Sequence, residues 1–218
     1  MENLPLVVAN FKANKTWDEV SSWIDEIGPA AEKFGGTIVV CPPMAFLGQT
    51  AEKIAKESPK IKIAVQDISQ FAQGRYTGEV AASQIKGLAA YAIIGHSERR
   101  TNFGEDDKIL TLKVQMAKEA GIEPIFCIQD ENTMIPEGIE IVAYEPVFAV
   151  GTGNPDSPQN VKKIAQAVKQ KRDLTVLYGG SVTADNAKSF LEEGAVDGVL
   201  IGQRSTDAQF FLGILKSI

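Results

Sequence analysis

The stretch that decides the fold is residues 139–153, which read IEIVAYEPVFAVGTG. Its first six residues are mostly apolar, with β-branched side chains at both odd and even positions. Such a run is typical of a parallel strand that is buried on both faces. The run ends in a carboxylate, Glu145, which is followed by a proline and by a segment that closes on Gly151-Thr152-Gly153. The pattern predicts a polar site at the carboxyl end of this strand.

Seven more runs of this kind occur, so the sequence predicts eight strands. They cover residues 6–9, 38–41, 61–65, 91–94, 124–128, 139–144, 175–178 and 198–201. Apolar residues at helical spacing lie between most of them. They predict helices over residues 17–34, 106–120, 159–171, 184–193 and 207–218. In the first helix the expected buried face is Val20, Trp23, Ile24 and Ile27. In the second it is Ile109, Leu112, Met116 and Ala117.

Eight strands that alternate with helices predict a parallel α/β fold. We expect a closed (β/α)8 barrel, with residues 1–218 forming a single domain near the lower end of the usual length. The link over residues 129–138 is too short for a full crossover and contains Pro136 and Gly138. The helix between strands 5 and 6 should therefore be largely missing. This would leave the outside of these strands poorly covered and would invite a partner subunit.

Composition excludes several classes of partner. The net charge of −6 weighs against nucleic acid and against anionic membrane surfaces. No apolar run of about 18 residues is present, so no membrane span is expected. The first ten residues show neither the basic flank nor the cleavage site of a leader peptide. Cys41 and Cys127 lie in apolar runs, which is typical of reduced core thiols in a cytoplasmic protein.

Polar residues gather where the predicted strands end, which is where the sites of parallel barrels lie. These strand ends are Asn10-Phe11-Lys12, Gly95-His96-Ser97-Glu98, Glu145, Gly179-Gly180-Ser181 and Gly202-Gln203. Each residue has an ordinary structural interpretation, such as a surface lysine, a hydrogen-bonded histidine or a glycine in a tight turn. Together they favour a site with a base, a neutral histidine at a helix start, a cation and backbone N–H groups for a phosphate.

Five stretches of this chain resemble the triosephosphate isomerase family. They follow the family's order and span nearly the whole chain, at residues 10–14, 76–79, 94–100, 143–153 and 177–182. The stretches around His96 and Glu145 are the most specific. The resemblance implies a TIM barrel that interconverts D-glyceraldehyde 3-phosphate and dihydroxyacetone phosphate. This aldose–ketose isomerisation belongs to glycolysis and gluconeogenesis.

The resemblance also implies roles for the polar strand ends. Glu145 would carry a proton between neighbouring carbons, while neutral His96 would polarise the substrate oxygens, which is the family's established arrangement. Lys12 would bind the substrate and stabilise the enediolate, Asn10 would help to place it, and Glu98 would support the site electrostatically. No metal or cofactor is implied, because fixed dipoles and charges stabilise the enediolate.

A closing segment over the site is implied as well. This lid would comprise Pro146, Val147, Phe148, Ala149, Val150, Gly151, Thr152 and Gly153, and would extend to residue 156. It would exclude water from the intermediate. Tyr178 and Ser181 would bond the closed lid. The phosphate would be held by backbone N–H groups of Gly151, Ser181, Gly202 and Gln203, and Asn10 and Lys12 would also bind the substrate.

Thr77 and Glu79 resemble the family's dimer loop, in which a threonine reaches the site of the neighbouring subunit. We therefore expect a homodimer, with a tetramer as the alternative. The partners implied are a small phosphorylated triose and further copies of the chain, with no nucleic acid and no membrane.

Several positions depart from the family pattern. Phe148 stands where the family usually has a tryptophan, and the acid that accepts the indole proton appears as Asp130. The far lid hinge reads Asn-Pro-Asp rather than Lys-Thr-Ala, and Pro155 should stiffen it. After strand 8, Gln203 and Arg204 follow Gly202 in place of the usual second glycine, which adds bulk and a cation near the phosphate.

Two other functions remain open from the sequence. One is a barrel that binds a phosphorylated sugar without turning it over, as a sensor or scaffold. The other is a different phosphate-binding barrel enzyme, such as a racemase or epimerase. The presence of all four polar catalytic positions argues against the first, and the pairing of Glu145 with a single histidine fits the second less well.

Overall fold

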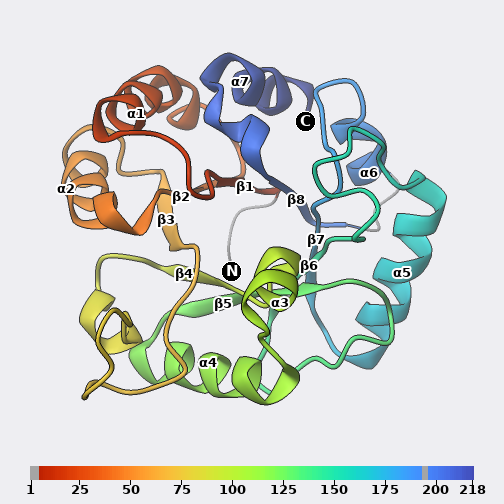
Figure 1. Ribbon diagram of the computed structural model, residues 1–218. Helices are drawn as coiled ribbons and strands as arrows, with labels where there is room; N and C mark the ends of the chain where they lie inside the picture. Colours follow the sequence, from red (N-terminus) through yellow and green to blue (C-terminus); the bar gives the residue numbers. More distant parts are fainter. Residues whose placement is uncertain (1–4, 193–195) are drawn as a thin grey trace.

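Eight parallel strands form a closed barrel that helices surround (Figure 1). A computed structural model describes residues 5–192 and 196–218. The expected helix end at Glu193 and the first four residues lie outside these ranges. Each strand pairs with its neighbour in sequence, and β8 closes the sheet on β1, with Leu6 beside Gly198. The predicted (β/α)8 barrel is therefore confirmed.

The strands begin and end within two residues of their predicted bounds. They are β1 (Leu6–Asn10), β2 (Thr37–Cys41), β3 (Lys62–Val65), β4 (Tyr91–Ile94), β5 (Glu123–Ile128), β6 (Ile141–Tyr144), β7 (Thr175–Tyr178) and β8 (Gly198–Ile201). The α-helices are α1 (Trp17–Ala31), α2 (Leu47–Glu57), α3 (Ser97–Phe103), α4 (Asp107–Ala120), α5 (Pro158–Lys171), α6 (Ala187–Glu192) and α7 (Ala208–Ser217). Short 3-10 helices are η1 (Met44–Phe46), η2 (Ala82–Ile85) and η3 (Gln203–Thr206).

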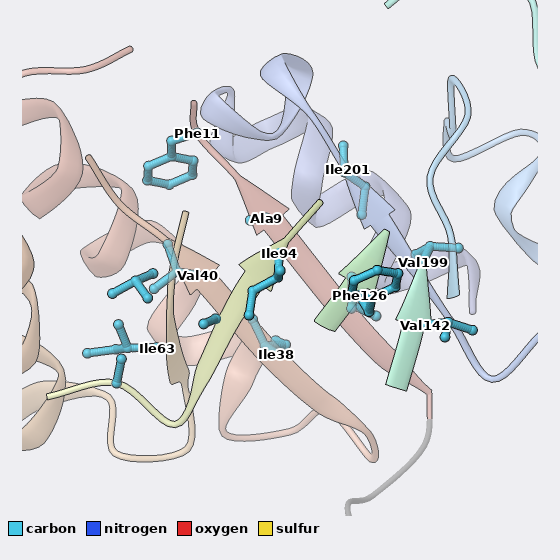
Figure 2. Packing of buried hydrophobic residues seen from close by; sticks show 14 of the residues in the cluster. Ala9, Phe11, Ile38, Val40, Ile63, Ile94, Phe126, Val142, Val199 and Ile201 are labelled. Atoms are coloured by element: carbon cyan, nitrogen blue, oxygen red, sulfur yellow. The ribbon is translucent and has the colours of Figure 1, made fainter. Parts of the chain in front are cut away.

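Two apolar layers hold the barrel together. Alternate strand residues, among them Val8, Ile93 and Cys127, form one apolar cluster that fills the interior. The other set, such as Val40 and Val142, packs with residues of the helices in a larger outer cluster (Figure 2). Strands buried on both faces explain the continuous apolar runs of the sequence.

The helix faces were predicted with mixed success. All four residues expected on the inner face of α1 are buried. The face predicted for α4 was wrong at three of its four residues, because Ile109, Leu112 and Met116 are only half-buried, and it was confirmed at Ala117. The buried residues of α4 are Leu110, Lys113, Val114, Ala117 and Ala120. Because Lys113 lies on the buried face, the apolar residues of that face do not form a continuous helical pattern. The predicted face is therefore displaced by one position from the buried one. Helix α2 was not predicted from the sequence.

The link between β5 and β6 contains no helix, as expected. The expectation that these strands are poorly covered was wrong, since the outward side chains of Phe126 and Val142 are fully buried. The link itself lies over them, with Ile135 packed against the outer cluster. Arg172, at the end of α5, fixes the link by donating to the carbonyls of Pro136 and Ile135, each over 2.9 Å. The chain thus covers these strands without a partner.

In the part of the chain that the structure describes, no helix is both long and apolar enough to cross a membrane. Cys41 and Cys127 are buried free thiols in the barrel interior.

Candidate active site

A cavity of about 530 Å³ opens at the carboxyl ends of the strands. Residues that follow five different strands line it, as the strand-end argument predicts. Among the lining residues are Lys12, His96, Glu98, Glu145, Gly151, Ser181, Gly202 and Gln203. Asn10 is buried behind this wall, where its Oδ1 accepts the backbone N–H of Lys12 over 3.1 Å. The residues named from the sequence for catalysis and phosphate binding therefore come together.

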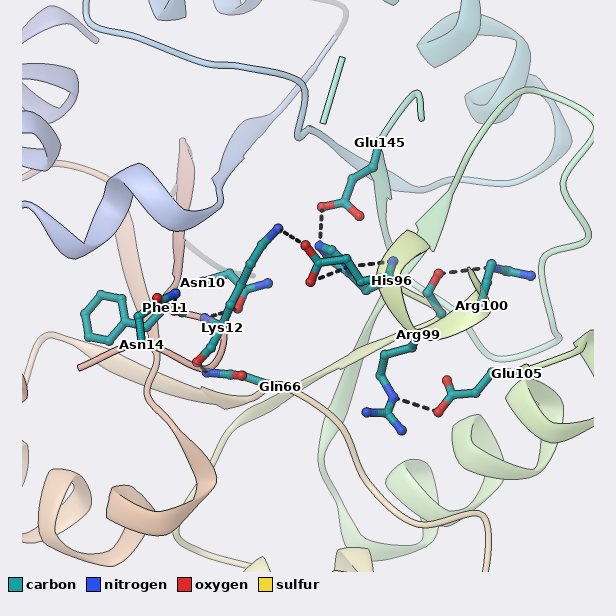
Figure 3. Close-up of polar contacts among 12 residues, drawn as sticks. Asn10, Phe11, Lys12, Asn14, Gln66, His96, Arg99, Arg100, Glu105 and Glu145 are labelled. Atoms are coloured by element: carbon teal, nitrogen blue, oxygen red, sulfur yellow. Dashed lines mark hydrogen bonds and ion pairs between the residues drawn. The ribbon is translucent and has the colours of Figure 1, made fainter. Parts of the chain in front are cut away.

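His96 occupies the N-cap of α3 and is 5% exposed. Its Nδ1 accepts the backbone N–H of Glu98 over 3.2 Å. A ring nitrogen that accepts a hydrogen bond carries no proton, so the imidazole is neutral and its proton resides on Nε2. Nε2 lies 3.5 Å from Oε1 of Glu145 (Figure 3). The histidine therefore presents a donor to the cavity beside a carboxylate.

Glu145 is 1% exposed, yet it lines the cavity. Its Oε2 has no hydrogen-bond partner among the described residues. Buried polar atoms are nearly always satisfied, so an unpaired carboxylate oxygen points to a functional site. Gly179 provides the space for this side chain, because a Cβ there would lie 2.7 Å from Cγ of Glu145. Cys127 is a neighbour of Glu145. Burial first and the charge of Glu145 second raise the pKa of the Cys127 thiol, so this thiol is neutral.

Lys12 is held in a strained position. Its φ of 53° lies in the left-handed region, which costs an L-residue about 1–2 kcal/mol. Asn10 bonds its N–H, and the side chain of Gln66 donates to its carbonyl over 2.8 Å. Its Nζ lies 2.5 Å from Oε1 of Glu98. A Cβ on Gly202 would lie 3.7 Å from the same ammonium, so Lys12 extends toward the end of β8.

Residues 146–156, which the resemblance interprets as a lid, are bonded to Tyr178 of β7 and to Ser181, which follows β7. Ser181 Oγ accepts the N–H of Gly153 over 3.0 Å and donates to the carbonyl of Ala149 over 2.6 Å. Tyr178 accepts the N–H of Asp156 through its hydroxyl, over 2.7 Å. These are the two side chains that the resemblance assigned to the closed lid. The bonds place the segment over the cavity in this structure.

Three residues that depart from the family pattern, Phe148, Asp130 and Arg204, differ in where their side chains lie. Phe148 is 60% exposed, and Asp130 turns back to accept the N–H groups of Asn132 and Thr133, each over 2.8 Å. Asp130 therefore caps its own turn. Arg204 lines the cavity, and its guanidinium stacks 3.8 Å from the centre of the Phe210 ring. The added cation thus lies at the cavity wall.

The sequence analysis missed Gln66, and it missed the contact between Gly179 and Glu145. Gln66 follows β3 and donates to the carbonyls of both Lys12 and Cys41, which joins three neighbouring strand ends. The signal was available, because Gln66 directly follows a predicted strand, as Asn10 and Glu145 do. Gly179 and Glu145 follow two different strands, β7 and β6. Residue spacing within one segment therefore cannot predict that Gly179 makes room for Glu145.

Thr77 and Glu79 do not line the cavity of their own chain and lie on an exposed loop after β3. The rings of Phe71 and Tyr76 stack at this loop, with centres 4.1 Å apart. Tyr76 is 44% exposed. The loop therefore presents an aromatic surface at a distance from the cavity.

Comparisons with known proteins agree with this geometry. A family model described as triosephosphate isomerase matches residues 5–140 and 137–218. The triosephosphate isomerase of Alkaliphilus metalliredigens is 34% identical over 97% of this chain and 98% of its own. That of Candida albicans is 32% identical over 97% of both chains. The crystal structure of triosephosphate isomerase from Bartonella henselae superposes with a TM-score of 0.85 at 28% identity, covering 98% of each chain. The chain therefore belongs to the triosephosphate isomerase family.

Proposed function

We propose that this chain interconverts D-glyceraldehyde 3-phosphate and dihydroxyacetone phosphate through an enediolate, as an enzyme of glycolysis and gluconeogenesis. One observation carries the proposal. The carboxylate of Glu145, almost fully buried, lies 3.5 Å from the protonated Nε2 of a neutral His96 on the wall of one cavity. A base and a neutral donor on the same cavity are the two groups that this proton transfer needs.

The proton has a simple path. Glu145 takes it from the carbon beside the carbonyl, and the electron pair of the C–H bond forms the enediolate, whose charge rests on oxygen. His96 donates from Nε2 to this oxygen and moves protons between the two substrate oxygens. Glu145 then returns its proton to the neighbouring carbon. The ammonium of Lys12 stabilises the enediolate charge. Asn10 holds the backbone N–H of Lys12, and Glu98 holds its ammonium.

The phosphate end of the substrate has its own partners. Backbone N–H groups of Gly151, Ser181, Gly202 and Gln203 bind the phosphate oxygens, and Lys12 contributes charge between the phosphate and the reacting carbons. Neutral backbone donors suit a phosphate that must enter and leave, because they bind without a fixed counter-ion. No residue in this scheme requires a metal or a cofactor.

Residues 146–153 act as the lid. Exclusion of water strengthens the electrostatic contacts of the cavity and protects the enediolate. The hydrogen bonds from Ser181 and to Tyr178 support a closed state that traps the substrate. Opening breaks these few bonds, which is consistent with a segment that closes and opens in each turnover.

The chain acts as one barrel domain over residues 1–218 and assembles as a homodimer in the cytoplasm. The exposed loop with Thr77 and Glu79 supports the dimer, since its stacked aromatic pair offers apolar area to a second copy. Analytical ultracentrifugation at assay concentrations measures the assembly state. A fully active monomer would contradict this part of the proposal.

The activity is tested by incubating the purified protein with glyceraldehyde 3-phosphate and following dihydroxyacetone phosphate through a coupled dehydrogenase. We expect rapid turnover, and we expect Glu145→Gln to lose about 10²–10⁴-fold in kcat, the usual share of a general base. Binding of inorganic phosphate should be retained in the variant. A wild-type protein that binds phosphate without turnover would favour a sugar-phosphate sensor instead. Unchanged kcat in the variant would reject Glu145 as the base.

A further inference from the structure

A buried carboxylate closes the far end of the lid. Asp156 follows Pro155 and precedes α5, and it is 8% exposed although charged residues are rarely buried without partners. It does not line the cavity. None of the catalytic or phosphate-binding roles proposed above uses this carboxylate.

Both carboxylate oxygens of Asp156 are engaged. Oδ2 accepts the hydroxyl of Tyr144 over 3.0 Å and the side-chain N–H of Asn160 over 2.7 Å. Oδ1 accepts the N–H of Ser157 over 2.7 Å. The backbone N–H of Asp156 itself donates to the hydroxyl of Tyr178 over 2.7 Å. The residue therefore joins the lid end to β6, β7 and α5 at once.

The simplest structural role for an acid here would be to cap α5. Ser157 already does this, because its Oγ accepts the N–H of Asn160 over 3.1 Å. Asp156 instead binds the side chain of Asn160. The cap is thus complete without Asp156, and its carboxylate is free to bind Tyr144.

The two tyrosines connect Asp156 to the proposed base. Tyr144 directly precedes Glu145, and Tyr178 directly precedes Gly179, which makes room for that carboxylate. The hydroxyl of Tyr144 is held as a neutral donor, since burial first and the bond to Asp156 second raise its pKa. A shift of the lid end would move the strand ends on which Glu145 depends.

Among residues 5–192 and 196–218, no side chain anchors the near end of the lid, Pro146 to Phe148, as Asp156 anchors its far end. Phe148 is largely exposed and has no side-chain donor, and Asp130 is engaged in its own turn. Ser181 holds the middle of the lid. The polar side-chain contacts of the lid therefore concentrate in its second half.

We infer that Asp156 is a positioning residue that holds the lid closed and, through Tyr144, fixes the strand end that carries Glu145. This inference rests on the proposed isomerase function. Substrate binding that closes the lid should depend on Asp156, whereas binding of a small anion to the phosphate site should not. The two kinds of ligand separate a role in closure from a role in folding.

The test compares Asp156→Ala, Asp156→Asn and Tyr144→Phe with the wild-type protein. Titrations measure the affinity for 2-phosphoglycolate, a phosphorylated mimic of the enediolate, and for inorganic phosphate. We expect Asp156→Ala to weaken 2-phosphoglycolate about tenfold or more, as for a lost hydrogen bond to a charged group, and to lower kcat. Phosphate affinity should change less than about twofold. Tyr144→Phe, which keeps the ring, should show the same pattern to a smaller extent.

Ser157→Ala is the control, because it removes the α5 cap without touching the carboxylate of Asp156. It should lower the melting temperature and leave the ratio of the two affinities unchanged. If Asp156→Ala and Tyr144→Phe behave like this control, with kcat and the ratio retained, the inference is wrong. Absence of wild-type turnover in the same assay would instead reject the proposed function, so the two failures are distinguishable.

Discussion

Two clusters of charged residues lie on either side of α3, and they differ in how completely their charges are paired. The cavity cluster consists of Lys12, His96, Glu98 and Glu145. The paired quartet consists of Asp67, Arg99, Glu105 and Lys113. Consecutive residues of α3 serve both, since Glu98 belongs to the first cluster and Arg99 to the second (Figure 3).

The paired quartet places two cations against two carboxylates. Lys113 is 4% exposed, and its Nζ lies 2.6 Å from Oδ1 of Asp67 and 2.6 Å from Oε1 of Glu105. Arg99 lies 3.0 Å from Asp67 and 2.6 Å from Glu105. One oxygen of Glu105 makes no hydrogen bond, but its other oxygen is shared by both cations.

The cavity cluster leaves its key acid unmatched. Lys12 is paired with Glu98, whereas Glu145 has only a neutral imidazole within 4 Å among the described ion-pair partners. Matched charges around a buried lysine hold helices in place, while an unmatched carboxylate on a cavity is available for a substrate proton. The absence of a paired cation, rather than burial, therefore separates Glu145 from the buried charges of the paired quartet among the described residues.

The largest effect is expected from breaking the quartet with Lys113→Met. This leaves Asp67 and Glu105 against a single cation, and removal of one partner of a buried ion pair costs about 3–5 kcal/mol of unfolding free energy. Urea unfolding measures this loss, and Lys108→Met on the exposed face of α4 is the control. The kcat of the folded variant should stay near the wild-type value. A variant as stable as the wild type would show that the quartet is not structural.

Gly179→Ala tests the cavity cluster by displacing Glu145. The added Cβ would lie 2.7 Å from Cγ of Glu145 and must displace that side chain. A shift of about 1 Å in a reacting group can cost about 10²-fold in rate. Steady-state kinetics should show this fall in kcat, with KM little changed. Gly48→Ala is the matched control, because nothing lies within 4 Å of a Cβ there. Equal kcat in both variants would mean that Glu145 tolerates displacement.

Arg204→Ala tests the added cation of the cavity wall. No ion pair of Arg204 occurs among the described residues, so its charge is unmatched like that of Glu145 but opposite in sign. An exposed charge contributes up to about 1 kcal/mol, so KM should rise about two- to fivefold at low salt. Lys216→Ala, at the far end of α7, controls for net charge. If both variants show the same KM, Arg204 does not reach the phosphate.

The smallest effect concerns stability at alkaline pH. Burial and the bond to Asp156 raise the pKa of Tyr144, so it stays protonated in the folded protein above pH 10, where tyrosines of the unfolded chain ionise. The unfolded state then binds fewer protons, and the unfolding free energy falls as pH rises above about 10. Denaturation followed from pH 8 to 11 should show a shallower fall in Tyr144→Phe. Equal slopes would contradict the assigned shift.

Much of this could be predicted from the sequence. The eight strands were visible because a doubly buried strand must be apolar at every position, and the site residues because parallel strands end at one edge. The outcome at α4 shows the limit of local patterns. Lys113 is buried only because Asp67, which follows β3, and Glu105, which precedes α4, neutralise it. The link that covers β5 and β6 is likewise fixed by Arg172, which follows α5 and lies 36 residues later in the chain than Pro136.

The division between the two clusters is tested most directly by measuring kcat and unfolding free energy on the same Glu145→Gln protein. The account predicts that kcat falls about 10²–10⁴-fold. It also predicts that the unfolding free energy stays equal or rises, because a buried charge without a cation is removed. A variant that keeps its kcat, or that loses stability as Lys113→Met does, would contradict the claim that Glu145 is an unmatched charge kept for proton transfer.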